Sequence, residues 1–175
     1  MISQATIIGR SHRLMQQNCH DFVTTGEPAP TCTFGLVLDG CGSKHRDNSG
    51  TTPSHNEVGA KLLGQFANTY LTTHLPNHAP NPLFFTNFYA ACRHFLGELL
   101  TFYPLPNSEA KRRFIATHLL CTVVGFVVKG ETAVFFWSGD GYLCHDGTIC
   151  ELDSHNRPDY LAYHLSEGEN GRFQT

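Results

Sequence analysis

The sequence predicts an α+β domain in which antiparallel sheets are flanked by helices. Two observations carry this prediction: β-rich runs lie in the first and last parts of the chain, and helical patterns lie between them. Strands and helices that are segregated along a chain favour antiparallel sheets with helices packed outside. The chain has 175 residues, enough to bury one hydrophobic core, so we expect a single domain over residues 1–175.

Three short β-rich runs precede the helices, at residues 5–9, 20–25 and 31–39. Turn residues in the sequence "GEPAP" separate the second run from the third, so these two runs are expected to form a hairpin. A hairpin places Asp21, near the start of one strand, close to Asp39, at the end of the other. The two carboxylates are therefore expected at the same end of the strand pair.

Two long helical patterns follow the strands. Ser54 is expected to cap the first helix, with Glu57 reaching back to the cap three residues later. Its expected buried face has apolar residues at helical spacing: Val58, Leu62, Leu63, Phe66 and Tyr70. The second helix is expected over about 83–102, with its own apolar stripe: Phe84, Phe88, Cys92, Phe95 and Leu99. Residues 107–114 fit either a short helix or a polar turn.

The region 116–152 is the clearest β region, with two apolar runs joined by "KGE" and shorter strands joined by "GDG" and "HDG". Asp-Gly suits a tight hairpin turn, so Asp140 and Asp146 are first of all predicted to be turn residues. The tail 166–175 is polar except for Phe173, and we expect it to add no closing element.

Charge and composition exclude several classes of function. The formal net charge is −3 and no basic block appears, which argues against a nucleic-acid or membrane-surface binder. No apolar run reaches the roughly 18 residues that would span a bilayer, and the N-terminus lacks a secretory signal pattern. The 7 cysteines have irregular spacing without a CxxC pair, so we expect reduced thiols in a cytoplasmic, monomeric protein.

Asp21, Asp39 and the carbonyl of Gly40 form a candidate metal site. Carboxylate and backbone carbonyl oxygens are hard ligands that suit Mg²⁺ or Mn²⁺. The alternative is an exposed strand-end aspartate and an ordinary turn aspartate. The same alternative stands for Asp140.

Cys41 raises a second possibility, because it lies between two glycines directly after a strand. A nucleophilic cysteine needs a nearby base, for which His45 or His55 is available. A long polar loop separates Cys41 from the next helix, unlike the immediate strand-to-helix turn of a nucleophile elbow. Cys41 and His45 also have zinc-ligand spacing, but a second ligand pair is missing.

Several segments together, in order, resemble the bacterial branch of the PP2C-type metal-dependent serine/threonine phosphatases. The resemblance extends over roughly residues 5–165 and rests on these segments: "GRSHRLMQQNCHDFV", "FGLVLDGCGS", "SHNEVGAKLL", "ATHLLCTVVGFVV", "FWSGDGYL" and "DSHNRPDYLAYHL". The resemblance implies a four-layer αββα sandwich of two antiparallel sheets flanked by helices. It also implies hydrolysis of phosphoserine or phosphothreonine in a phosphorylated protein substrate.

The resemblance further implies two divalent cations, Mn or Mg, that activate a shared water for attack on the phosphoryl group. It places Asp39 as the ligand that bridges both ions, Asp21 as a ligand of one, and the Gly40 carbonyl as a ligand of the other. Asp140 matches an aspartate that holds a further, weaker ion or braces its turn. Arg13, with Arg10 as the alternative, is the candidate that could take the place of the family's phosphate-binding arginine.

The chain also departs from the family pattern. Cys41 stands where many relatives have a histidine after Asp-Gly, Gln16 where many have a phosphate-binding arginine, and His20 where glutamine or glutamate is common. The later aspartate motifs of the family do not follow Phe173, so the chain resembles a domain truncated at its C-terminus. The alternative function is therefore a catalytically inactive PP2C-like module that binds a partner or phosphopeptide.

Overall fold

A computed structural model of the chain describes residues 2–14, 17–42, 46–47, 50–51, 53–152, 158–165 and 171–175. Its strands, in chain order, are β1 (Asp21–Ala29), β2 (Cys32–Asp39), β3 (Arg46–Asp47), β4 (Gly50–Thr51), β5 (Val123–Lys129), β6 (Thr132–Ser138), β7 (Gly141–His145) and β8 (Thr148–Leu152). Its helices are α1 (Arg10–Leu14), α2 (Asn56–His74), α3 (Pro82–Thr101), α4 (Ser108–His118) and the 3-10 helix η1 (Leu161–Leu165).

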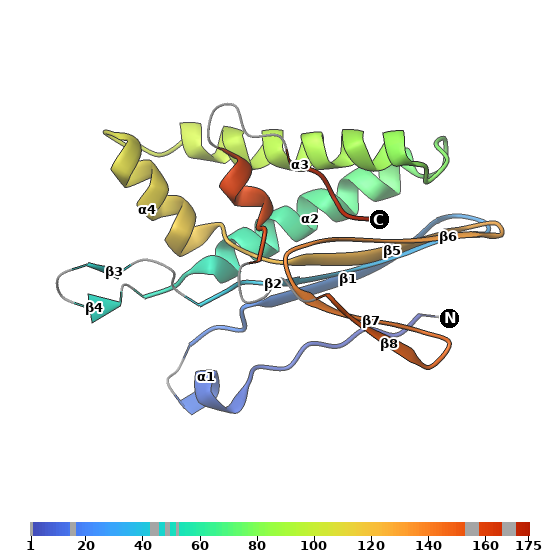
Figure 1. The fold of residues 1–175 in the computed structure, drawn as a ribbon, viewed down its shortest axis with the longest axis horizontal. Coiled ribbons are helices and arrows are strands. Elements are labelled where there is room, and N and C mark those ends of the chain that lie inside the picture. Colours follow the sequence, from blue (N-terminus) through green and yellow to red (C-terminus); the bar gives the residue numbers. More distant parts are fainter. Residues whose placement is uncertain are drawn as a thin grey trace.

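The strands form antiparallel sheets, as the sequence predicts. The main sheet has four strands in the order β1-β2-β5-β6, and β7 pairs with β8 in a separate hairpin. Helices α2 and α3 lie over one face of the main sheet, and the β7–β8 hairpin lies on the other side (Figure 1). The α+β class is confirmed, and the described residues supply a helical layer, the main sheet and the β7–β8 layer.

The core lies between the main sheet and its helical layer. Alternate residues of β2 point to this side, because successive side chains of a strand face opposite ways. Phe34, Leu36 and Leu38 of this strand are each no more than 1% exposed. Phe136 of β6 packs against the rings of Phe85 and Phe88 of α3, with centroid distances of 5.1 and 5.8 Å. This aromatic packing fixes α3 on the sheet.

The β1–β2 hairpin is confirmed and is longer than predicted. β1 continues through Gly26 and Pro28, with an irregularity in the register between Gly26 and Ala29. Proline is tolerated here because β1 is an edge strand, where an N–H group is not needed for pairing on the outer side. The predicted strand at 5–9 is wrong: this segment is irregular, and Ile7 is 78% exposed because it finds no sheet partner.

The first long helix begins later than predicted, and the expected cap is only partly formed: Ser54 accepts from the Asn56 N–H at 3.3 Å, but it is not the N-cap residue. Its N-cap is His55, without a side-chain cap hydrogen bond. Ser54 donates to the carbonyl of Cys41 at 2.8 Å, and Glu57 turns toward Asn18. The buried face is also shifted relative to the prediction, since Val58 and Leu62 are 36% and 41% exposed. Gly64 faces the sheet, where the ring of Phe22 fills the space that a larger side chain would need.

The second long helix, α3, lies where it was predicted. Residues 108–114 form the first part of another helix, α4, and Asn107 is its N-cap. Residues 116–118, predicted to start a strand, are the last turn of α4, and β5 begins only at Val123. Asp146 and Gly147 form the predicted β7–β8 hairpin turn, with positive φ at both residues. The hairpin predicted around Asp140 is wrong, because β6 and β7 belong to different sheets.

The tail adds an element that the sequence did not predict. Phe173 is buried against Phe88 and Tyr89, with ring centroids 5.2 Å apart in both cases. Gln174 exchanges two backbone hydrogen bonds with Trp137 of β6, at 2.9 and 3.0 Å. The last residues therefore cover part of the β6 edge. They also close one end of the core.

Candidate functional site

Asp21 and Asp39 are direct partners in the β1–β2 ladder. Asp21 is the first residue of β1 and Asp39 the last of β2, so both lie at the same end of the main sheet. Side chains of directly opposed residues in an antiparallel pair project from the same face. The predicted convergence of these two carboxylates is thus a consequence of the strand register.

The two carboxylates influence each other electrically. Burial raises the pKa of Asp39, and the adjacent Asp21 raises it further, while His20 acts in the opposite direction. A second carboxylate close by disfavours the ionised form of Asp39. Such a pair is a suitable environment for a divalent cation.

The backbone of Asp39 is held in place by the residue that precedes β5. The Asp39 N–H donates to the hydroxyl of Thr122 at 3.2 Å, and the Thr122 N–H donates to the Asp39 carbonyl at 2.9 Å. The ladder continues past the end of β2, since Gly40 and Cys121 form an isolated bridge. The candidate site therefore stands on the central strands and not on a loose loop.

Gly40 lies against the first turn of α2. A β-carbon at this position would be 2.7 Å from the backbone carbon of Asn56 and 2.9 Å from the nitrogen of Glu57, so only glycine fits without moving the helix. Its N–H donates to the carbonyl of His20 at 3.1 Å. Its own carbonyl accepts a hydrogen bond from Nδ1 of His20 at 3.0 Å. This carbonyl, predicted to hold a cation, thus already has a protein partner.

The other ring nitrogen of His20 faces a buried carboxylate. Its Nε2 lies 3.6 Å from Oε2 of Glu57, whose side chain is 7% exposed. Asn18 donates to Oε1 of Glu57 at 3.1 Å, and His55 lies 3.8 Å from the same oxygen. Burial acts to raise the pKa of Glu57, but the Asn18 hydrogen bond and the neighbouring histidines lower it below its usual value overall. Glu57 is therefore an anion within a ring of polar partners.

Asp140 shares a cleft with Asp39. The cleft has a volume of about 300 Å³, and Thr122, Tyr142 and Glu151 also line it. Asp140 also acts on the pKa of Asp39, which places it within electrostatic reach of that carboxyl. Within the described part of the chain, however, no three His, Cys, Asp or Glu side chains are grouped closely enough to hold a metal ion. The carboxylates of this cleft therefore do not form a complete metal-binding cluster among the described residues.

Arg13 lies on the short helix α1, and its side chain is exposed. No contact joins its side chain to Asp21 or Asp39 among those the structure describes. The helix itself is anchored beside the site, because the ring of His12 packs on that of His20 at 4.7 Å. Arg13 is thus carried on a segment that borders the acidic centre.

Cys41 is part of a polar network and not of a visible catalytic pair. Nδ2 of Asn56 lies 3.4 Å from its sulfur and 3.0 Å from its carbonyl oxygen. His45, one of the two bases considered for it, lies outside the described residues, as does any Cys41–His45 zinc pair. His55, the other base, faces Glu57 and the ring of His118 instead.

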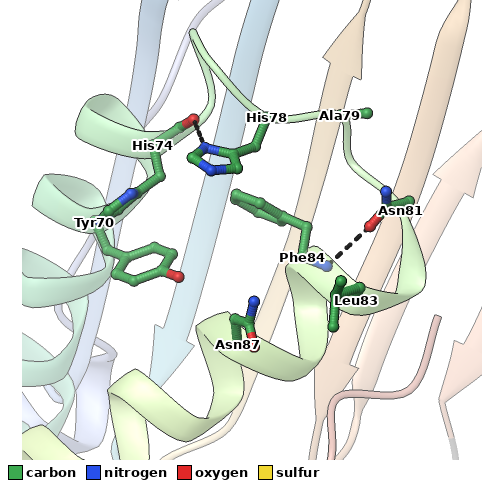
Figure 2. A pocket seen from close by; sticks show the side chains of 8 residues that line it. All are labelled: Tyr70, His74, His78, Ala79, Asn81, Leu83, Phe84 and Asn87. Atoms are coloured by element: carbon green, nitrogen blue, oxygen red, sulfur yellow. Dashed lines mark hydrogen bonds between the residues drawn. The ribbon is translucent and has the colours of Figure 1, made fainter.

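A separate hollow lies at the connection between α2 and α3, away from these carboxylates (Figure 2). It has a volume of about 130 Å³ and is lined by aromatic and amide side chains: Tyr70, His74, His78, Ala79, Asn81, Leu83, Phe84 and Asn87. His78 donates from Nδ1 to the carbonyl of His74 at 2.9 Å, and Asn81 caps α3 by accepting from the Phe84 N–H. These bonds stabilise the connection, and the lining contains no carboxylate.

Three residues of the site were not predicted from the sequence. They are His20, which holds the Gly40 carbonyl, Glu57, which faces His20, and Asn56, which is completely buried. Asn56 also accepts from the N–H of Leu120 at 2.9 Å and so joins three segments of the chain. His20 was noted from the sequence only as a departure from the family pattern, and no partner was predicted for it. Glu57 was predicted to be a helix-capping residue only.

Comparison with known proteins identifies the family. The protein phosphatase 2C family profile matches residues 8–163, which is most of the chain. The chain therefore belongs to the protein phosphatase 2C family, and its antiparallel sheets and helical layer agree with this assignment. No curated protein matches the chain at a significant level. Over the described residues, the helices are too short or too polar for a membrane crossing.

Proposed function

We propose that the protein is a metal-dependent phosphatase that hydrolyses phosphoserine or phosphothreonine in phosphorylated proteins. The observation that carries the proposal is the direct pairing of Asp21 with Asp39 at one end of the main sheet. Membership of the protein phosphatase 2C family supports the reaction class, since that family is generally dependent on Mn or Mg.

The donor set fits a hard divalent cation. Asp21 and Asp39 would hold Mn²⁺ or Mg²⁺ between their carboxylates, because these ions prefer oxygen ligands and because a cation there would offset the repulsion that raises the pKa of Asp39. A cation bound there supplies charge neutralisation and an acidified water molecule for phosphoryl transfer. The chain's own part is to fix the carboxylates, through the β1–β2 register and the two Thr122 hydrogen bonds.

Asp140 and Arg13 have supporting roles in this proposal. Asp140, which lines the same cleft as Asp39, would brace its turn beside the bound ion. Arg13 would bind the substrate phosphate from α1, because a guanidinium forms charge-assisted, paired hydrogen bonds with phosphate oxygens. Support for Arg13 is the packing of its neighbour His12 against the site.

A second candidate function is a non-catalytic phosphatase-like module that binds a partner or phosphopeptide. It is favoured by one observation: the described residues contain no group of three metal-ligating side chains. Affinity for a divalent ion depends on the number and charge of its ligands, so an incomplete set weakens binding. This candidate predicts partner binding that survives Asp39→Asn.

The experiment measures hydrolysis of p-nitrophenyl phosphate and of a phosphothreonine peptide, with Mn²⁺ and with EDTA. The proposal predicts turnover with Mn²⁺, none with EDTA, and none for Asp39→Asn. Asp146→Asn is the matched control, because it makes the same chemical change at an exposed turn where asparagine tolerates the positive φ. Turnover that is indifferent to both EDTA and Asp39→Asn contradicts the proposal, and inactivation by iodoacetamide alone favours a Cys41 hydrolase.

A further inference from the structure

The Gly40 carbonyl and His20 suggest that this acidic centre differs from a two-metal site. We propose that the His20 ring takes the place of a second cation, so that the protein binds one divalent cation, between Asp21 and Asp39. The inference rests on the proposed function, because it concerns the same carboxylates. It does not depend on catalysis, since it is a statement about the number of ions bound.

The first support is the hydrogen bonding between His20 and Gly40. A carbonyl oxygen only accepts, so Nδ1 of His20 must carry the hydrogen of this 3.0 Å contact. The backbone of the two residues is joined as well, since the Gly40 N–H donates to the His20 carbonyl at 3.1 Å. An N–H group and a divalent cation both present positive charge to an oxygen. A cation at this carbonyl would therefore have to displace the ring or lie against it.

The second support is that the ring is fixed from its other side. Nε2 faces Oε2 of Glu57 at 3.6 Å, and this oxygen is buried and has no hydrogen-bond partner among the described residues. Asn18 holds the other oxygen of the same carboxylate. Rotating His20 away from Gly40 would break its hydrogen bond to that carbonyl and open a cavity beside the buried Glu57 side chain. The ring is therefore held between Gly40 and Glu57.

The third support concerns the surroundings. His20 is 8% exposed, so its ring fills the space beside the Gly40 carbonyl and leaves little room there for an ion and its waters. The described residues provide no three-ligand group that would compensate for the loss of this carbonyl. A cation held by Asp21 and Asp39 needs neither the carbonyl nor the space of the ring.

The test is the number of Mn²⁺ ions bound per chain, measured by equilibrium dialysis or by the EPR signal of free Mn²⁺. The wild-type protein is expected to bind one. His20→Ala uncovers the Gly40 carbonyl and the Glu57 carboxylate around a ring-sized space, so the count is expected to rise to two. His20→Asn places an amide N–H where Nδ1 lies and is expected to remain at one. His12→Ala, which removes a neighbouring imidazole, is the control and is also expected to remain at one.

The number of Mn²⁺ ions bound by the wild type and by His20→Ala either supports or overturns the inference. Two ions in the wild-type protein overturn the inference even if His20→Ala does not fold. One ion in both the wild type and a folded His20→Ala also overturns it, because the ring is then not what excludes the second ion. No Mn²⁺ in the wild type contradicts the proposed metal-dependent function itself, and this result is distinguishable from the other two.

Discussion

Asp21 and Asp39 face one another across the β1–β2 ladder, and the pKa of Asp39 is raised by burial and by its neighbour. Nothing in the strand pairing requires carboxylates here, because either position would accept an apolar or neutral polar side chain. Two anions at adjacent ladder positions cost stability in the absence of a cation. An unfavourable pair of carboxylates at this position therefore indicates a binding site for a cation.

Asp39→Asn is expected to raise the melting temperature of the metal-free protein, because it removes the repulsion with Asp21. Mn²⁺ is expected to raise the melting temperature of the wild type but not that of the variant. A ligand at a hundred times its Kd stabilises by about 2.7 kcal/mol, which is easily detected. Differential scanning fluorimetry with EDTA and with Mn²⁺ checks both points. An equal Mn²⁺ response in the two proteins would place the ion elsewhere.

Gly40→Ala is expected to destabilise the fold by about 1–3 kcal/mol, the usual range for overpacking a closely packed site. The added methyl group would meet backbone atoms of Asn56 and Glu57, which cannot move without shifting α2. Gly42→Ala is the matched control, because no atom of the described residues lies within 4 Å of the place that its methyl group would occupy. Urea unfolding of both variants checks the prediction, and equal midpoints would count against this packing.

Asn56→Ala is expected to cost about 1–3 kcal/mol, because it leaves buried polar groups without partners. Among these is the Leu120 N–H, which donates to the Asn56 side chain at 2.9 Å; the Cys41 carbonyl also loses its bond from Asn56 but keeps the one from Ser54. Asn87→Ala, on the exposed face of α3, is expected to change stability little. Chemical denaturation measures both. A loss no larger for Asn56 than for Asn87 would mean that this network does not hold the site together.

His118 is expected to make stability depend on pH below neutrality. Burial and the nearby His55 lower the pKa of His118, so the folded protein favours the neutral ring more than the unfolded chain does. The stability that depends on the neutral His118 ring is fully present above the pKa of the unfolded chain, about 6.5. It is lost as the pH falls through the lower pKa of the folded protein. Melting temperatures of the wild type and His118→Gln between pH 8 and 5 should therefore converge as the solution becomes acidic. His94→Gln, at an exposed position on α3, should run parallel to the wild type.

The parts of the fold that follow from local patterns were predictable from the sequence. The hairpin, with Asp21 opposite Asp39, came from alternation and turn residues, and the second long helix came from its apolar spacing. The segment 5–9 shows the limit of this reasoning. A β-rich run becomes a strand only if a partner edge is available, and the main sheet begins instead with β1.

The inner part of the site depends on tertiary contacts and was not predictable in this way. His20 meets Gly40 and Glu57 only because α2 packs closely on the ends of β1 and β2. Glu57 looked like a capping residue because Ser54 precedes it at the right spacing, but its carboxylate accepts from Asn18, while Ser54 bonds both Asn56 and Cys41. Contacts with residues distant in the sequence, and not local capping preference, therefore determine where the Glu57 side chain lies.

The most direct test of the central claim compares Asp39→Asn with Cys41→Ser, using phosphate release from a phosphothreonine peptide in the presence of Mn²⁺. The two residues are nearly adjacent, so both variants disturb the same strand end, but they remove different chemistry. We expect that Asp39→Asn falls to the rate seen with EDTA and that Cys41→Ser keeps most of the wild-type rate. Activity that is retained in Asp39→Asn and lost in Cys41→Ser would contradict a metal-dependent mechanism.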